Sequence, residues 1–194
     1  MAWTTLGTVA PGDVLRANSG TAAYNNIIGN VTDIRAAQIN VQSVTKTDTF
    51  SASTASNTET AAITGLSVTI TPSSATSKVL LIASLALNAT VLSFPAWVAI
   101  NVYRGATQVG SGAAAGSRTR AIRPGLVGVA SVSPETAFSH LDEPGVATAI
   151  TYDIKLRNLS GSTQTLYLNR GTDDSDTYQF LRSASTLTAI EVPV

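Results

Sequence analysis

The sequence predicts a mainly β protein: a β-sandwich of about eight strands, preceded by a short helix. From residue 65 onward, short stretches alternate apolar with polar side chains, as strands with one buried face do. Gly, Pro, Asn and Ser residues separate those stretches and supply turns. Residues 23–34 differ, because their apolar side chains recur at helical spacing. These observations favour two packed sheets with a helical appendage.

The helical segment has one apolar face. Its large apolar residues follow one another at alternating steps of three and four, the heptad spacing of a coiled coil: Tyr24, Ile27, Val31 and Ile34. Barely two heptads are present, too few for a coiled coil to be stable alone. Gly29 weakens the helix further, by about 1 kcal/mol relative to Ala. The stripe therefore needs a partner, either other copies of the chain in a short bundle or the chain's own β domain.

The strands are expected in order along the rest of the chain. Residues 42–63 are rich in Ser, Thr and Ala and predict a linker with a first edge strand near 47–53. Each later strand is predicted by an alternating or continuous apolar stretch that ends in a turn signal. These stretches are residues 65–72, 78–87, 96–110 as a hairpin turning at Gly105, 137–145, 148–158, 164–170 and 186–192.

One uncharged run, Val79–Tyr103, has the length of a membrane span. Polar residues and a proline interrupt its middle, where a lipid-exposed backbone could not be satisfied: Asn88, Thr90, Ser93 and Pro95. Two buried strands joined by a loop explain the run better than membrane insertion.

Composition narrows the functional classes. The 194 residues fit one domain plus an appendage. Only 12% are charged and the formal net charge is +0, so no broad electrostatic field recruits nucleic acid or an anionic membrane. The chain has no cysteine, which excludes disulfides, thiolate metal sites and cysteine nucleophiles. We expect no secretory signal, because the amino terminus has neither a basic region nor a continuous apolar core.

Candidate catalytic groups are few. The only histidine, His140, lies beside Asp142 and Glu143, and such a group is suited to base catalysis or metal binding. No further ligands accompany it, and no G-x-S-x-G nucleophile motif occurs. We therefore interpret His140 as a strand-end residue beside a turn. No enzymatic activity, metal or cofactor is expected.

Two clusters of charge are candidates for ligand or intersubunit contacts. Asp173, Asp174 and Asp176 share one predicted loop, but the loop lacks the glycine and bidentate glutamate of an EF-hand, so a solvated acidic turn is favoured over a calcium site. Arg118 and Arg120 follow a glycine-rich stretch that lacks the Lys-Ser/Thr ending of a P-loop. On a strand they would share one face. There they would pair with the acidic loop, within the chain or across a subunit boundary, or meet an anionic ligand such as a sugar acid.

Two parts of the sequence resemble small virion structural proteins of tailed bacteriophages. The opening MAWTTLGTVAPGDVLRANSGTAAYNNIIGNV is similar to the start of phage tail and fibre proteins. The β part is similar to jelly-roll domains that end phage fibres, through GLSVTITPSSATSKVLLIASL, AAGSRTRA, FSHLDEPG, ITYDIKLRN, LYLNR and ASTLTAIEV. Together these parts cover most of the chain.

The resemblance implies a homotrimer with a tumour-necrosis-factor-like jelly roll, residues 46–194, joined to the virion by an arm, residues 1–45. A three-fold assembly would bury the stripe as its trimer interface: Tyr24, Ile27, Val31 and Ile34. The arm's apolar residues would contact other virion proteins: Trp3, Leu6, Val14 and Leu15.

The expected function is therefore that of a non-enzymatic virion protein, made in the host cytoplasm. It would form a trimeric fibre or fibre-like projection whose β domain faces outward and contacts host surface polysaccharide. Because no long shaft separates the helix from the β domain, a capsid decoration protein that stabilises the shell is the alternative. Two other classes stay open: a tail-associated polysaccharide-cleaving enzyme that uses dispersed carboxylates, and a stand-alone sugar-binding lectin.

Overall fold

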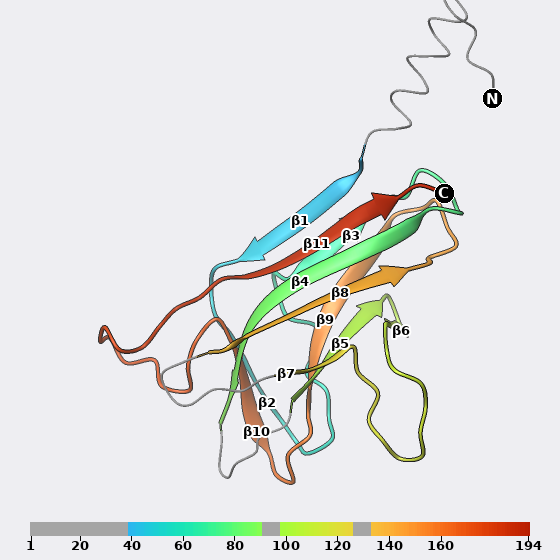
Figure 1. Cartoon of the computed structure of the whole chain (residues 1–194). Helices are drawn as coiled ribbons and strands as arrows, with labels where there is room; N and C mark the ends of the chain where they lie inside the picture. The colour runs from blue at the N-terminus through green and yellow to red at the C-terminus, as the bar shows by residue number, and fades with distance from the viewer. Residues whose placement is uncertain (1–38, 91–97, 126–132) are drawn as a thin grey trace, which may run out of the picture. The chain divides into compact units, whose positions relative to one another are not determined.

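The structure, a computed structural model, describes residues 39–90, 98–125 and 133–194 (Figure 1). The chain divides into two units between Gln38 and Ile39, and the described residues all belong to the second unit. Those residues form two antiparallel sheets that pack together as a β-sandwich. The predicted helix and the predicted attachment residues lie outside the described residues: Tyr24, Ile27, Val31, Ile34, Trp3, Leu6, Val14 and Leu15.

The first sheet is built around the long strand β4 (Lys78–Ala89). Most of β4 pairs with β8 on one side and β11 on the other, and its last residues pair with β10. Strand β1 extends the sheet beyond β11, and β2 extends it beyond β10. The other bounds in this sheet are β1 (Val41–Lys46), β2 (Phe50–Thr54), β8 (Glu135–Asp142), β10 (Gln164–Leu168) and β11 (Ser185–Val192).

The second sheet has the order β3-β9-β5-β6, with β7 paired to β5. Strands β5 and β6 form the predicted hairpin, and Gly105 takes a φ of 60° at its turn, a conformation that glycine adopts without steric strain. The bounds in this sheet are β3 (Ser67–Ile70), β5 (Val98–Arg104), β6 (Thr107–Val109), β7 (Arg123–Gly125) and β9 (Ile150–Asn158).

Alternate residues of the facing strands form the core between the sheets. Tyr152, Ile154 and Leu156 of β9 are fully buried, as the alternation in the sequence predicts. Burying each large apolar side chain stabilises the fold by about 1.5–3 kcal/mol. The facing sheet contributes Val79, Leu81, Leu85, Leu87, Leu166, Leu168, Leu187 and Ala189.

Most strands lie where the sequence predicts them. Strands β3, β4, β8, β9, β10, β11 and the β5–β6 hairpin each overlap a predicted stretch, although β4, β8 and β11 extend beyond its ends by one or two residues. Strand β1 instead occupies part of the predicted linker, and β7 has no counterpart among the predicted strands. The described residues therefore form eleven strands, more than the predicted eight or so.

The uncharged run from the sequence forms β4 and β5, two strands as expected. In the part of the chain that the structure describes, no helix has both the length and the hydrophobicity needed to cross a bilayer.

A buried carboxylate holds the start of β1, which lies beside the end of β11. Glu191 of β11 is 5% exposed and accepts hydrogen bonds from the Ser73 backbone N–H (2.7 Å) and from Asn40 Nδ2 (3.2 Å). Burial alone would raise its pKa, but hydrogen bonds from Ser73 and Asn40 hold the pKa of Glu191 below its ordinary value. Residue 40 is thereby fixed to the sandwich. The loop between β10 and β11 lies at the opposite end of β11 (Figure 1).

A second buried cluster ties the two sheets together. The Tyr152 hydroxyl of β9 donates a hydrogen bond to Asp142 Oδ2 of β8 (2.8 Å). Arg104 of β5 places its Nε 2.9 Å from the same oxygen. Burial, together with the bond to Asp142, raises the pKa of Tyr152, so the hydroxyl remains a donor. This cluster fixes β8 of the first sheet against β5 and β9 of the second.

Candidate functional site

The two outer faces of the sandwich differ in chemistry. We call the outward side chains of β1, β11, β4 and β8 the apolar face. It consists of three cross-strand rows: Val41, Ile190, Leu80 and Leu141; Ser43, Thr188, Ile82 and Ser139; Thr45, Thr186, Ser84 and Ala137. We call the outward side chains of the second sheet, with Glu59, the polar face. It consists of Ser67, Thr69, Asn101, Tyr103, Gln108, Thr151, Asp153, Lys155 and Arg157.

The apolar face exposes large aliphatic groups. Val41 is 47% exposed, and Ile82 and Leu141 are each 43% exposed. The first row runs across all four strands as an unbroken line of aliphatic residues, and Ile82 continues it into the second row. Isolated exposed apolar residues are normal in a monomer, whereas a contiguous patch marks an interaction site. This face is therefore the strongest candidate for association.

Charge is confined to the perimeter of the apolar face. None of the residues in its three rows is charged. At one end, beyond the first row, Lys78 Nζ pairs with Glu143 Oε1 at 2.6 Å. At the other end, Ser84 Oγ donates a hydrogen bond of 2.6 Å to Glu135. Within the face, the hydroxyls of Ser43 and Thr188 bond one another at 2.8 Å.

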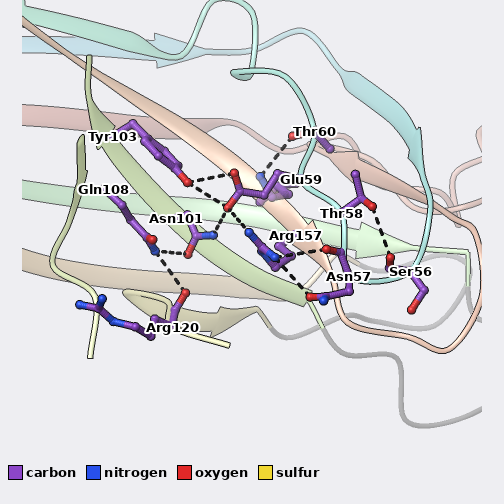
Figure 2. Close-up of polar contacts among 11 residues, drawn as sticks. Ser56, Asn57, Thr58, Glu59, Thr60, Asn101, Tyr103, Gln108, Arg120 and Arg157 are labelled. Atoms are coloured by element: carbon purple, nitrogen blue, oxygen red, sulfur yellow. Dashed lines mark hydrogen bonds and ion pairs between the residues drawn. The ribbon is translucent and has the colours of Figure 1, made fainter. Parts of the chain in front are cut away.

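The polar face has Glu59 at the centre of a hydrogen-bonded network (Figure 2). Glu59 forms an isolated bridge with Arg157 of β9, which places its side chain over the second sheet. Its carboxylate accepts hydrogen bonds from Asn101 Nδ2 (2.6 Å), the Tyr103 hydroxyl (2.9 Å) and Arg157 Nη2 (3.1 Å). Burial alone would raise its pKa, but the bonds from Tyr103, Asn101 and Arg157 hold the pKa of Glu59 below its ordinary value of 4.5.

The same network extends outward from Asn101. Gln108 Nε2 donates to Asn101 Oδ1 (3.0 Å) and to the backbone oxygen of Arg120 (3.1 Å). Lys155 Nζ lies 4.3 Å from the centroid of the Tyr103 ring, a cation–π contact that covers the ring. These polar groups bind one another, so the network stabilises the face in water and fastens Glu59 to the sheet.

Sequence reasoning missed Glu59 because it lies in the Ser- and Thr-rich stretch predicted as a linker and edge strand. The sequence carries a partial signal for this network. Alternation along each strand places Asn101 and Tyr103 on one side of β5, and Lys155 and Arg157 on one side of β9. That the two strands are neighbours, with Asn101 opposite Lys155, comes only from the structure.

The predicted acidic loop is closed by arginines from its own ends. Arg182 binds Asp174 through two parallel bonds, Nε to Oδ1 (2.7 Å) and Nη2 to Oδ2 (2.6 Å), and Arg170 Nη1 lies 3.3 Å from Oδ2. Asp173 accepts bonds from the backbone N–H and hydroxyl of Ser175, as in a local turn. Asp176 is exposed in the same loop. In the described ranges no group of three or more His, Asp or Glu side chains could hold a metal ion.

The two arginines that the sequence offered as partners of the acidic loop, or of a ligand, lie in a different loop. Arg118 and Arg120 are in the loop between β6 and β7, where residues 116–121 form a turn and an irregular segment, so the two side chains do not share the face of a strand. Arg120 donates from Nε to the Gly112 oxygen (2.6 Å) and from Nη2 to Ser111 Oγ (2.8 Å). Within the described chain Arg120 is thus bound in its own loop, while Asp174 is paired with Arg170 and Arg182. Their contact with a ligand or another subunit stays a prediction.

The histidine and its two carboxylate neighbours point to different partners. His140 lies against Gly110, so closely that a Cβ at residue 110 would be 3.0 Å from its Cγ. Asp142 belongs to the cluster between the sheets, and Glu143 pairs with Lys78. The three residues therefore do not converge on one point.

No protein-family description matches the chain, and no curated protein gives a significant sequence match.

Proposed function

We propose that this chain is a non-enzymatic structural protein of a tailed-phage virion, assembled as a homotrimeric fibre or fibre-like projection. The observation that carries the proposal is the contrast between the two outer faces. One face is uncharged and exposes a row of aliphatic side chains, whereas the other presents a polar network suited to water. Such a contrast is expected of a subunit with one side in an assembly and the other in solvent.

The strand order supports a jelly-roll arrangement of the tumour-necrosis-factor type. In the sheet portions β1-β11-β4-β8 and β3-β9-β5-β6, neighbours are antiparallel and mostly far apart in sequence. The chain passes from one sheet to the other at β3, β4, β5, β8, β9 and β10. Jelly rolls are double-sheet sandwiches of this kind, built from Greek-key connections.

In this proposal, residues 1–40 attach the domain to the virion and supply the helical stripe of the trimer seam. The bonds from Asn40 to Glu191 and to the Thr71 oxygen (2.9 Å) hold residue 40, where the sandwich begins, and so support a load-carrying attachment at that point. The loop at the opposite end exposes Tyr178 to 91%, which supports outward contact with host polysaccharide there.

Two measurements test the proposal. Native mass spectrometry of the full chain should give three times the chain mass of 20.0 kDa. Antibody raised against the protein should label tails of intact particles in electron micrographs. A monomer at high concentration, or absence of label on particles, would contradict the proposal.

A capsid decoration protein is the second candidate. It is favoured by the short spacing between the predicted stripe, which ends at Ile34, and β1, which begins at Val41, because a fibre normally has a shaft there. The same antibody experiment separates the two functions, since a decoration protein would be labelled on the shell.

A polysaccharide-cleaving enzyme receives less support from the contacts. Asp142 and Asp174, the carboxylates dispersed along the sequence that such an enzyme would use, each pair with an arginine. Release of reducing ends from host polysaccharide, lost on Asp174→Ala, would favour the enzyme.

A further inference from the structure

We propose that the loop between β6 and β7 is a proteolytic modification site, where a protease with specificity for arginine cleaves the bond between Arg118 and Thr119 in the folded chain. The two pieces, residues 1–118 and 119–194, then stay joined through the sandwich. The step is a hydrolysis: water adds to the amide, which leaves a carboxylate on Arg118 and an amine on Thr119. Such a site is independent of the virion function.

The loop is long, exposed and built of small residues. It spans residues 110–122, and every residue from 112 to 120 is exposed. Residues 112–117, which precede the arginine, read GAAAGS. A Cβ added at Gly112 or Gly116 would meet no described neighbour within 4 Å, so this part of the chain has open space around it. Exposed loops of small or polar residues are the preferred sites of proteolytic cleavage, because a protease must draw the chain into its cleft.

Of the three arginines at the end of this loop, Arg118 is the one that a protease can take up. Its guanidinium forms no hydrogen bond or ion pair with the part of the chain that the structure describes. The Arg120 side chain is instead bound within the loop, and its backbone oxygen accepts a bond from Gln108. Arg123 belongs to β7, and the bond after it leads into Pro124, whose nitrogen carries no hydrogen to donate.

The other basic residues of the described ranges are less accessible. They lie in strands or at strand ends, or pair with a carboxylate: Lys46, Lys78, Arg104, Lys155, Arg157, Arg170 and Arg182. Even Arg182, on an exposed loop, is fastened, because its guanidinium binds Asp174 and the next N–H, that of Ser183, bonds to the Asn169 oxygen (3.2 Å). Cleavage at these positions requires paired segments to open first, so it is slower than cleavage of a loop that is already exposed.

The place of the loop in the strand order decides what cleavage does to the fold. Strands β1 to β6 precede the loop, and β7 to β11 follow it. The two groups alternate across the first sheet, β1-β11-β4-β10-β2 with β8 on β4, and across β3-β9-β5 with β7 on β5 in the second. Among the strand pairs of the described residues, only β5–β6 joins two strands from the same side of the loop. The backbone hydrogen bonds of every other pair therefore hold the two pieces together.

The polar contacts between strands also cross the cut. Glu59 and Arg104 lie before the loop, and their ion-pair partners Arg157 and Asp142 lie after it. Neither piece has enough strand pairs to fold by itself, because most of its strands would be edges with unpaired backbone groups. Cleavage is therefore tolerated only after the chain has folded.

Timed digestion of the full chain with trypsin tests the site. The diagnostic product is the fragment from Thr119 to Val194, identified by mass spectrometry, and cuts within residues 1–38 do not alter it. We expect Arg118→Gln to slow all cleavage within residues 39–194 at least about tenfold, because the remaining sites require local opening. Arg118→Lys, which trypsin also accepts, should keep the cut. Arg120→Gln is the matched control and should release the same fragment at least as fast as the parent.

The cleaved protein gives the second measurement. In buffer, size-exclusion chromatography should show both pieces in one peak, and circular dichroism should show the β signal of the uncleaved chain. In urea, where the strand pairs are broken, the pieces should separate.

Each contrary result overturns a defined part of the proposal. A first cut after Arg120, or cleavage of Arg118→Gln within residues 39–194 as fast as the parent, would overturn the site. Pieces that separate in buffer, or lose the β signal there, would overturn their retention by the alternating strands. A folded chain that trypsin leaves intact within residues 39–194 would overturn both. None of these results bears on the virion function, which is decided by mass and antibody labelling.

Discussion

The apolar face and the polar face are built from the same kind of strand, yet they deal with water in different ways. On the polar face the outward groups bind one another, with the Glu59 carboxylate as the common acceptor for Asn101, Tyr103 and Arg157. On the apolar face, aliphatic groups as large as Ile82 and Leu141 remain about two-fifths exposed. In both sheets the inward residues pack into the shared core. The chemistry of each outer face is therefore set by its outward residues.

The two faces also differ in what they are expected to stabilise: the polar face the folded subunit, and the apolar face its association. Removing a partner from the polar network leaves a half-buried polar group without its bond, which lowers the stability of the subunit. Changing a residue in the apolar rows removes little that the subunit alone needs. We therefore expect substitutions on the polar face to change folding, and those on the apolar face to change association.

The largest expected effect comes from the buried cluster of Asp142, Tyr152 and Arg104, which ties the two sheets together. Asp142→Ala leaves Tyr152 fully buried without its acceptor and Arg104 without its counter-charge. Removing one partner of a buried ion pair costs about 3–5 kcal/mol, and we expect about 3 here because Arg104 is partly exposed. Urea denaturation followed by circular dichroism measures this free energy of unfolding. Asp142→Asn, which keeps an acceptor for Tyr152, should lose less; equal loss in both variants would show that the Tyr152 bond contributes nothing.

The next effect is on the polar face. Glu59→Ala deprives Asn101, which is 1% exposed, of its acceptor, and removes the acceptor of Tyr103 and Arg157 as well. We expect the free energy of unfolding to fall by about 2 kcal/mol, the loss typical when hydrogen bonds to a charged group disappear. Thr69→Ala on the same face is the control and should stay within about 0.5 kcal/mol of the parent. If the two variants unfold alike, the network does not stabilise the subunit.

A smaller effect should appear on acidification. The pKa values of Glu59 and Glu191 lie below the ordinary 4.5, so the folded state favours their ionised forms. Their contribution is therefore fully present above pH 4.5 or so and is lost as the pH falls through the lowered folded-state pKa values. We expect the free energy of unfolding to decrease from pH 5 to pH 3 or so. Glu59→Gln, which cannot titrate, should show a shallower decrease over that interval; an identical pH dependence would assign the effect to other acids.

The smallest effect is predicted on the apolar face. Thr188→Val removes the hydroxyl bond to Ser43 and adds a methyl group to a face that already exposes aliphatic residues. The free energy of unfolding, measured on dissociated subunits at low concentration, should change by no more than about 0.5 kcal/mol. A loss as large as that of Glu59→Ala would mean that this face stabilises the subunit itself, and the division between the faces would fail.

The strands with alternating apolar and polar residues were predictable from the sequence, because every second side chain of such a strand faces the core. In β9, residues 152, 154 and 156 face the core and the residues between them face outward, and turn residues mark both ends. Strand β1 escaped prediction since only Val44 and Lys46 turn inward, and a lysine at a core-facing position contradicts the pattern. Strand β7 is three residues long and contains a proline, which is not typical of a strand interior.

The candidate site was less predictable, because it depends on which strands are neighbours. Nothing in the sequence places Val41 beside Ile190 or Leu80 beside Leu141, and without that register the aliphatic line is invisible. The partners that Asp174 has within its own chain were hard to predict for a similar reason. Asp174 pairs with Arg170 and Arg182, which lie at the two ends of its own loop. They are closer to Asp174 along the chain than Arg118 and Arg120 are.

The pairing of β1 with β11 has a mechanical consequence. Asn40 lies where β1 begins, and all six residues of β1 pair with β11 along the direction in which the strand runs. A pull between Asn40 and the far end of the sandwich would therefore load the six pairs in shear, at the same time, instead of peeling them apart one by one. A domain tethered at that point is built to resist tension along β1 and β11 better than tension across them.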